Sequence, residues 1–352
     1  MNIHDIMQML SDKHGSDIHI KVGMPPHLRV DGQLLPIEGT PKLSSEQAEA
    51  LIIPLLSAEQ KEFLAKEKEL DFGYQFREVG RFRINVYHQQ GTIAAAFRLI
   101  PTEIKTLDEL SMPTVLHEFT HYRQGLILVT GPTGEGKSTT LAAMIDEINH
   151  TRNQHILTIE DPIEFIYKSD KSIISQREMH LDTLGWEIAL RSALRQDPDV
   201  VLVGEMRDYE TIAAAITTAE TGHLVFATLH TSTAAQTIDR IVDVFPAHQQ
   251  AQIRQQLAST IVAVLSQRLI PRTNGGRVAA CEIMIANGAI RNLIREAKTH
   301  QIDTVIQTSA ASGMMLIENH LLTMVQQGVI TATQAREYAF RLQEMDRLLG
   351  GN

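Results

Sequence analysis

The feature that most constrains this chain is a glycine-rich segment between an apolar run and a helix-forming stretch. Residues 131–139 (GPTGEGKST) fit the pattern G-x-x-x-x-G-K-[ST]. They follow the apolar run 126–130, which is too short for a helix core, and precede a helical pattern near 137–149. Glycines let a backbone curl so that several N–H groups point at one anion, and a helix start adds the positive end of its dipole. The pattern predicts a phosphate-binding loop in an α/β fold.

Each fixed position of this segment has a chemical reason. We expect Lys137 to reach the β- and γ-phosphates as a point charge, and the Ser138 hydroxyl to bind Mg²⁺. The alternative is a glycine-rich surface loop, which the position between an apolar run and an amphipathic helix disfavours. The residues predicted to contact the nucleotide are Gly131, Pro132, Thr133, Gly134, Glu135, Gly136, Lys137, Ser138 and Thr139.

From residue 114 onward, short apolar runs alternate with helical stretches, which is typical of a parallel sheet with crossover helices. The apolar runs are 126–129, 155–159, 200–203 and 224–227, and the helical stretches lie near 137–149, 183–195, 208–220 and 234–244. Further strands are expected at about 264–270 and 278–285, before a helical end from about 288 to 348.

The first hundred residues have a different, mixed α+β pattern. Helical spacing at 3–12, 44–56 and 58–67 accompanies strand patterns at 16–22, 69–76, 81–88 and 92–99. Two prolines bound residues 101–113, where the periodicity stops. We therefore predict an amino-terminal domain at 1–100, a linker at 101–113, a core at 114–286 and a helical region at 287–352.

Composition narrows the classes of partner. The 352 residues include 32 Lys and Arg against 42 Asp and Glu, a formal charge of −10, so no general attraction to nucleic acid or anionic lipid is expected. The single cysteine, Cys281, excludes a disulfide framework within one chain and suits a reducing compartment. No apolar run approaches a membrane span, and the start lacks the pattern of a signal peptide. We expect a cytoplasmic protein that reaches a membrane only through a partner.

Carboxylates at strand ends are candidates for activating water. Glu205 follows the apolar run 200–203, at the end of a strand where ligands sit in open α/β sheets, and is our candidate catalytic base. An aspartate at the strand end itself is missing, so Mg²⁺ is expected to rely on Ser138, water and Glu205. Glu160, Asp161 and Glu164 end another strand, and their alternative is an ordinary charged loop.

Histidines and arginines supply further candidates. His223 and His230 bracket an apolar strand, and their odd spacing makes a shared metal ion improbable. His230, at the carboxyl end, is placed to sense a γ-phosphate. Arg81, Arg83 and Arg98 lie in strand patterns of the amino-terminal domain, where they are either surface ion pairs or guanidinium groups that neutralise charge on the γ-phosphate.

Four further segments accompany the glycine-rich loop. They are TIEDPIEF at 158–165, RQDPD at 195–199, GEMRD at 204–208, and TGH at 221–223 with TLHT at 228–231. In order and spacing these motifs resemble those of the type II/IV secretion ATPase superfamily. SDIH at 16–19, RFR at 81–83 and AIRNLIRE at 289–296 resemble the type IV pilus retraction ATPases of the PilT family. The likeness covers nearly the whole chain.

This resemblance implies a RecA-like P-loop ATPase core of α/β class, with a smaller α+β, PAS-like amino-terminal domain and a helical C-terminal region. It implies that residues 131–139 are the Walker A loop, Glu205 the Walker B glutamate and residues 160–164 an aspartate box. His223 and His230 would then form a histidine box.

The same resemblance implies a homohexamer that binds ATP and Mg²⁺. Arginines matching Arg83 and Arg98 would reach toward a nucleotide bound between domains, and residues 289–296 would serve retraction rather than hydrolysis. The expected partners are the inner-membrane pilus platform protein and the pilus base, with the hexamer at the cytoplasmic face of that membrane. One departure is Glu135, where the family usually has serine, so the side chain either points to solvent or weakens nucleotide affinity.

Several alternatives stay open at this point. Pilus-extension and type II secretion assembly ATPases carry a longer amino-terminal extension and usually a four-cysteine zinc module, neither of which is seen here. An auxiliary retraction paralogue has the same motifs. A RecA-type DNA motor would need a basic, aromatic-bearing channel. A scaffold that binds ATP without turnover is disfavoured by the presence of Lys137, Ser138 and Glu205 together.

Overall fold

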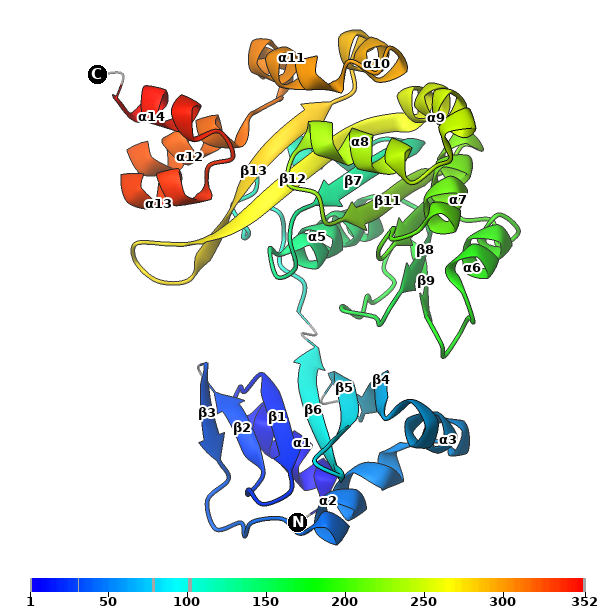
Figure 1. Cartoon of the computed structure of the whole chain (residues 1–352), viewed down its shortest axis with the longest axis vertical. Coiled ribbons are helices and arrows are strands. Elements are labelled where there is room, and N and C mark those ends of the chain that lie inside the picture. The colour runs from blue at the N-terminus through cyan, green and yellow to red at the C-terminus, as the bar shows by residue number, and fades with distance from the viewer. Residues whose placement is uncertain (1, 31, 78–79, 101–102, 351–352) are drawn as a thin grey trace. The chain divides into compact units, whose positions relative to one another are not determined.

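The computed structural model describes residues 2–30, 32–77, 80–100 and 103–350 (Figure 1). Contacts divide the chain into two compact units. The first comprises Met1–Glu103 together with Pro162–Ile166, and the second comprises Ile104–Asp161 and Tyr167–Asn352. Residues 101–102 of the predicted linker lie outside the described residues. Between 103 and 114 the chain forms turns without a regular helix or strand.

The first unit is built on a six-stranded antiparallel sheet with strand order β3-β2-β1-β6-β5-β4. Its strands are β1 (Asp17–Lys21), β2 (His27–Val30), β3 (Gln33–Pro36), β4 (Glu69–Phe76), β5 (Gly80–Gln89) and β6 (Thr92–Ile100). Its helices are α1 (Ile3–Asp12), α2 (Ser45–Ile52) with the 3-10 turn η1 (Ile53–Leu55), and α3 (Ala58–Glu67). Each of these α-helices begins with a capping box, which satisfies amide groups that the first turn leaves unpaired.

Side-chain alternation along β5 separates the two faces of this sheet. Phe82, Ile84 and Val86 are fully buried in the core of the first unit. Arg81 and Arg83 alternate with Phe82 and Ile84 along the strand and therefore lie on the opposite face. The sheet thus has one apolar face under the helices and one polar face that carries arginines.

The second unit contains a seven-stranded sheet with strand order β13-β12-β7-β11-β10-β8-β9. All neighbours in it pair in parallel except β12 and β13, which are antiparallel. The strands are β7 (Gly125–Thr130), β8 (His155–Glu160), β9 (Ile173–Glu178), β10 (Val200–Val203), β11 (Leu224–Leu229), β12 (Ile261–Pro271) and β13 (Arg277–Ile285).

Helices follow the strands as crossovers and then form the C-terminal region. The α-helices are α4 (Val115–Phe119), α5 (Lys137–Thr151), α6 (Trp186–Ala193), α7 (Tyr209–Glu220), α8 (Ala234–Asp243), α9 (Ala247–Thr260), α10 (Gly288–Arg295), α11 (Ile302–Thr308), α12 (Ile317–Gln326), α13 (Ala332–Tyr338) and α14 (Leu342–Gly350), with 3-10 turns η2 (Thr299–Gln301) and η3 (Ala310–Ser312). No helix of the described ranges is long and apolar enough to cross a membrane.

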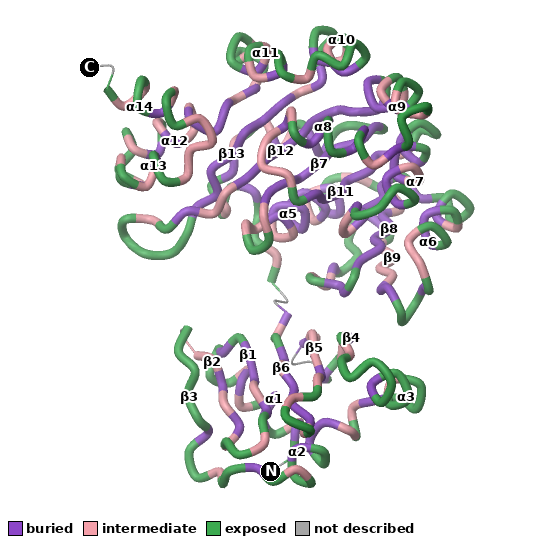
Figure 2. The backbone as a smooth tube through the Cα atoms, in the orientation of Figure 1, coloured by how far each residue is buried: buried purple, intermediate pink, exposed green. Residues whose placement is uncertain are grey.

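The central strands of this sheet are buried on both faces, as their unbroken apolar runs predict. Every residue of β7, β10 and β11 is buried. In Figure 2, β7 and β11 are drawn largely in the purple of buried residues. Helices α4 and α9 and strand β9 were not predicted from the sequence. Strand β9 lies at the sheet edge and is mostly half-exposed, and α9 is rich in glutamine and buries only four residues, so neither carries a strong apolar period.

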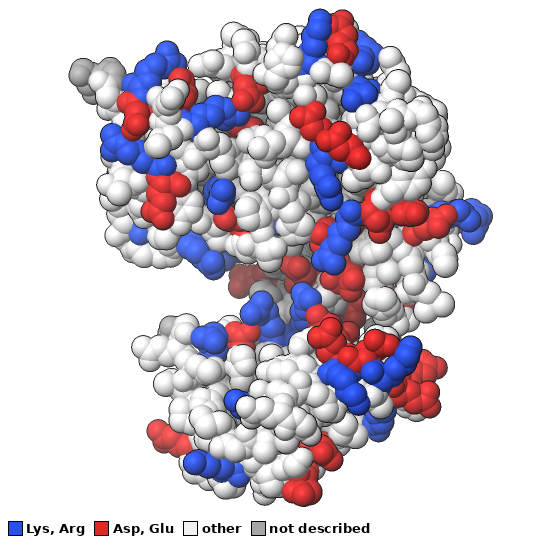
Figure 3. All heavy atoms as spheres, in the orientation of Figure 1, with Lys and Arg blue, Asp and Glu red and all other residues white. Residues whose placement is uncertain are grey.

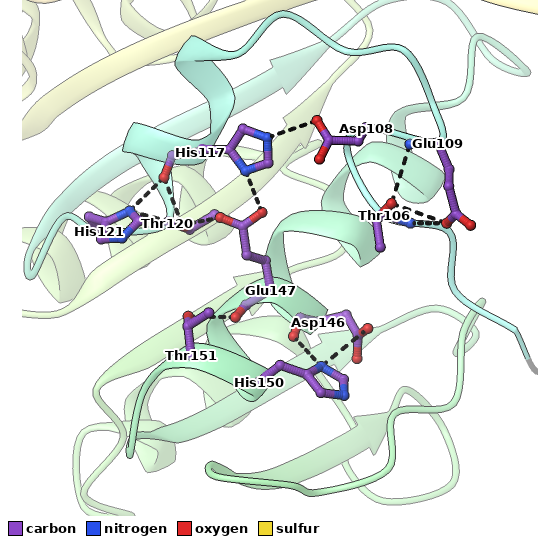
Figure 4. Close-up of polar contacts among 10 residues, drawn as sticks. All are labelled: Thr106, Asp108, Glu109, His117, Thr120, His121, Asp146, Glu147, His150 and Thr151. Carbon is purple, nitrogen blue, oxygen red and sulfur yellow. Dashed lines mark hydrogen bonds and ion pairs between the residues drawn. The ribbon is translucent and has the colours of Figure 1, made fainter.

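The segment before β7 is tied to α5 by a polar cluster (Figure 4). His117 on α4 places Nδ1 2.7 Å from a carboxylate oxygen of Glu147, and Thr120 donates a hydrogen bond of 2.8 Å to the other. The second ring nitrogen of His117 lies 3.4 Å from Asp108. Burial lowers the pKa of His117, but the hydrogen bonds and charges of Glu147 and Asp108 outweigh it, so the pKa is raised overall. The His117 ring and the Thr120 hydroxyl therefore fasten this segment to the helix that begins at the glycine-rich loop.

Candidate active site

The glycine-rich loop joins the end of β7 to the start of α5. Gly131 has a φ of 144°, and a Cβ there would lie 2.5 Å from the backbone oxygen of Gln267. Gly136 caps α5 with a φ of 80°. Both positions lie in a region that favours glycine, so the residue type is required by the path of the loop. The loop leads directly into the first turn of α5, whose amide groups have no partner within the helix and suit an anion.

Lys137 is the first residue of α5 and bends back over the loop. Its Nζ donates hydrogen bonds to the carbonyl oxygens of Gly131 (2.8 Å) and Pro132 (2.9 Å). Only 9% of the residue is exposed. An ammonium group at the first turn of a helix, next to a glycine-rich loop, is the chemistry that a polyphosphate requires. The half-buried Ser138 follows it and adds a hydroxyl.

The expectation that the Glu135 side chain points to solvent is wrong. One carboxylate oxygen accepts a hydrogen bond from the Leu269 amide, and the other lies 3.7 Å from Nη1 of Arg268. The side chain is 15% exposed. The negative charge is therefore held against β12, which the sequence analysis did not connect with the loop.

Polar residues of β12 support the loop and were missed from the sequence. Ser266 is 2.7 Å from the Thr130 hydroxyl at the end of β7. The side chain of Gln267 donates to the Glu135 carbonyl (2.5 Å) and accepts from Thr140 (3.0 Å). Both residues are almost completely buried in an apolar strand. The sequence did contain an indication of this role. Ser266 and Gln267 interrupt an otherwise apolar strand, and buried polar side chains need hydrogen-bond partners.

Glu205 and His230 come together at the carboxyl ends of neighbouring strands. Val203 of β10 pairs with Ala227 of β11, so the residues that follow these strands share one edge of the sheet. His230 Nε2 and Arg207 Nε each lie 2.8 Å from the same oxygen of Glu205. Burial alone would raise the pKa of the Glu205 carboxyl, but Arg207 and His230 lower it by more, so it stays below its ordinary value.

Glu160 ends β8, the next strand in the sheet, and is buried. Its carboxylate accepts hydrogen bonds from Thr158 (2.6 Å) and Gln176 (3.3 Å). The strand order β7-β11-β10-β8 therefore lines up the loop, His230, Glu205 and Glu160 along one sheet edge. Asp161 is exposed beside Glu160.

Other predicted site residues lie elsewhere in the chain. His223 precedes β11, and its Nδ1 lies 3.0 Å from the carbonyl oxygen of Thr218 in the last turn of α7. A six-residue strand separates it from His230, so the two rings are roughly 20 Å apart and do not form one site. Glu164 belongs to the segment grouped with the first unit.

Arg83 and Arg98 are direct cross-strand partners on β5 and β6 of the first unit. Arg83 pairs with Asp71 at 2.6 Å and Arg98 with Asp17 at 2.9 Å. Asp17 in turn lies opposite Arg29, which the sequence analysis did not select. These residues form a row across the polar face, and Arg98 keeps 72% of its side chain exposed. The row contains three arginines and two aspartates, and Arg98 is its most exposed member.

Comparison with known proteins assigns the family. The profile described as "Type II/IV secretion system protein" matches residues 2–347. The chain belongs to this family. It is 50% identical over 339 residues to the type IV pilus retractation ATPase PilT of Pseudomonas aeruginosa, covering 96% of this chain and 98% of that protein. It is 49% identical over 321 residues to the twitching motility protein of Neisseria gonorrhoeae, covering 91% and 86%.

The chain is also similar to a solved structure, the crystal structure of the pilus retraction motor PilT and bound ADP. It matches with a TM-score of 0.92 and 46% identity, and covers 99% of both chains. The predictions of the PilT family and of an α/β fold with a helical C-terminal region are confirmed.

The oxygen donors of this site suit magnesium. Mg²⁺ is usually held by one or two protein oxygens together with substrate phosphates and water. Ser138 and Glu205 are donors of that kind. Over the described part of the chain, no group of three or more His, Cys, Asp or Glu side chains is arranged to hold a metal ion by itself. The hydroxyl of Ser138 and the carboxylate of Glu205 fit a cation that binds together with the phosphates of a nucleotide.

Proposed function

We propose that this chain is a Mg²⁺-dependent ATPase that assembles as a homohexamer and powers type IV pilus retraction. The observation that carries the proposal is the alignment of the phosphate loop, His230 and Glu205 along one sheet edge, in a chain that is 50% identical to a pilus retraction ATPase. A cation-bearing loop and an ionised carboxylate at one edge are the parts that phosphoryl transfer to water needs.

The loop amides and Lys137 would hold the phosphates of ATP, and Ser138 would hold its Mg²⁺. The metal would neutralise negative charge on the phosphates. Glu205 would orient the attacking water and accept its proton. His230 and Arg207 support that role because they fix one carboxylate oxygen and favour the ionised form. Glu160, Glu164 and the neighbouring acidic loop would assist near metal or water.

Arg83 and Arg98 would supply guanidinium groups to the γ-phosphate. Their position on the polar face of the first sheet and the exposure of Arg98 support this role. Asp71 and Asp17 form ion pairs with Arg83 and Arg98 in the same row. Hydrolysis would then change the relation of the two units and so produce motion.

We propose that the hexamer works in the cytoplasm, at the inner-membrane face, on the pilus platform protein and the pilus base. A pilus-extension or secretion-assembly ATPase, or an auxiliary retraction motor, is the alternative. A nucleic-acid motor is disfavoured by the formal charge of −10. On the face of the second unit that Figure 3 displays, basic and acidic side chains are interspersed rather than gathered into a basic stripe.

Deletion of the gene, followed by imaging of pili, tests the proposal. Surplus pili that fail to retract are expected, whereas cells without pili would indicate an assembly motor. An auxiliary role would be indicated if the deletion alone leaves the pili unchanged and twitching is lost only when a second motor is deleted as well. Complementation with Lys137→Ala should fail, and wild-type chain should restore retraction.

A further inference from the structure

A carboxylate inside a phosphate-binding loop creates a charge conflict. Glu135 lies between Gly134 and Gly136, the residues that shape the loop beside the site for the phosphates. If the Glu135 carboxylate turned toward the phosphates, the two negative charges would repel each other. The fold directs this carboxylate to the Leu269 amide and to Arg268, at 3.7 Å from Nη1. Two groups of β12, the Leu269 amide and the Arg268 guanidinium, therefore hold the Glu135 carboxylate in this orientation.

Arg268 has a second partner outside the loop. Its guanidinium carbon lies 5.3 Å from the centre of the Phe340 ring, which is a cation–π distance. Phe340 belongs to the connection between α13 and α14. Arg268 therefore stands between the phosphate loop and the C-terminal helices, although it is on neither of them.

Phe340 is itself held by a buried cluster of charges. Its amide donates to Glu318 at 3.0 Å, and the adjacent Arg341 contacts both Glu318 and Glu282 at 2.9 Å. Asp303 completes the cluster at 2.7 Å from Arg341. Glu282 and Glu318 are fully buried, so the charges are fixed rather than solvated. The position of Phe340 is thus set by the docking of the C-terminal helices.

We propose that Arg268 is a positioning residue that couples nucleotide affinity to the docking of α12–α14. While the Phe340 ring holds the guanidinium, Arg268 keeps Glu135 on β12 and away from the phosphates. When the C-terminal helices undock, Arg268 loses its support and Glu135 is free to approach the site. Because coupling between two equilibria is reciprocal, bound nucleotide must stabilise the docked helices. The inference rests on nucleotide binding at the loop and not on a role in pili.

A charge-rescue cycle tests the first half, with a fluorescent ADP analogue as the probe. Arg268→Gln should weaken binding about fivefold to fiftyfold, because Glu135 loses its counter-charge. Adding Glu135→Ser should bring affinity back to within about twofold of Glu135→Ser alone. Arg268→Lys should recover part of the loss. Binding by Arg268→Gln at the wild-type level, or a defect that Glu135→Ser leaves unchanged, overturns the proposal.

Two experiments test the coupling between nucleotide affinity and the docking of the C-terminal helices: substitution of Phe340, and hydrogen exchange in the wild-type protein. Phe340→Leu removes the π face and should weaken ADP binding about threefold or more, whereas Phe340→Tyr should retain it. In the wild-type protein, ADP should slow amide hydrogen exchange in residues 332–350. Equal exchange with and without ADP contradicts the coupling. A wild-type chain that does not bind the probe at all contradicts the nucleotide site itself, which is a separate result.

Discussion

Gly131→Ala probes how tightly the phosphate loop is packed against β12. The φ of 144° at this position is a region that alanine avoids, and its Cβ would lie 2.5 Å from the Gln267 carbonyl oxygen, which is backbone and cannot rotate away. Ordinary contact begins at 3.4 Å, so the loop or β12 must move by about 0.9 Å. The conformational strain alone costs about 1–3 kcal/mol. If the free loop relieves this strain and must restore it to bind nucleotide, affinity falls by about 5- to 150-fold.

Gly134→Ala is the matched control in the same loop. Gly134 also has a positive φ, 84°, but nothing lies within 4 Å of its Cβ position. Its expected loss is about 1 kcal/mol, or roughly fivefold. Both variants are titrated with a fluorescent ADP analogue, and thermal unfolding without nucleotide shows whether each remains folded. If Gly131→Ala binds ADP as well as Gly134→Ala, the close packing of loop and β12 does not control the site.

Four further predictions concern single side chains. Lys137→Ala should weaken ATP binding by about 10- to 100-fold, and unchanged affinity in a titration would remove the loop from the site. Glu205→Gln should bind ATP yet lower turnover by about 10²- to 10⁴-fold in a phosphate-release assay, and wild-type turnover would assign the base elsewhere. Arg83→Ala and Arg98→Ala should retain ADP binding while hydrolysis falls by about 10³-fold or more, and normal hydrolysis in both would rule out their role. His117→Gln should lower the thermal stability more near pH 6 than near pH 9. The pKa of His117 is raised in the folded protein, so its contribution to stability is present below the ordinary pKa of about 6.5 and is lost as the pH rises through the pKa of the folded protein. An equal loss of stability at both pH values would contradict this.

Much of the second unit follows from local pattern. Strands β7, β10 and β11 are buried on both faces, so each is an apolar run that sequence alone reveals. The phosphate loop is equally local, because its glycines and Lys137 act within a few residues of one another. Helix α9 and the edge strand β9 were missed because their burial is partial and their side chains largely polar. Local periodicity reports burial, and it is weak where burial is incomplete.

The tertiary structure alone decided the relations between distant segments. His230 and Glu205 meet because β10 and β11 are neighbours, whereas His223, in the same sequence motif, lies at the other end of its strand. Glu135 turns to Arg268, 133 positions further along the chain, because β12 lies beside β7. The sequence by itself determined which residue types could bind phosphate and which runs could form the sheet, since both depend on near neighbours. Which charges face each other depended on strand order, which no local pattern contains.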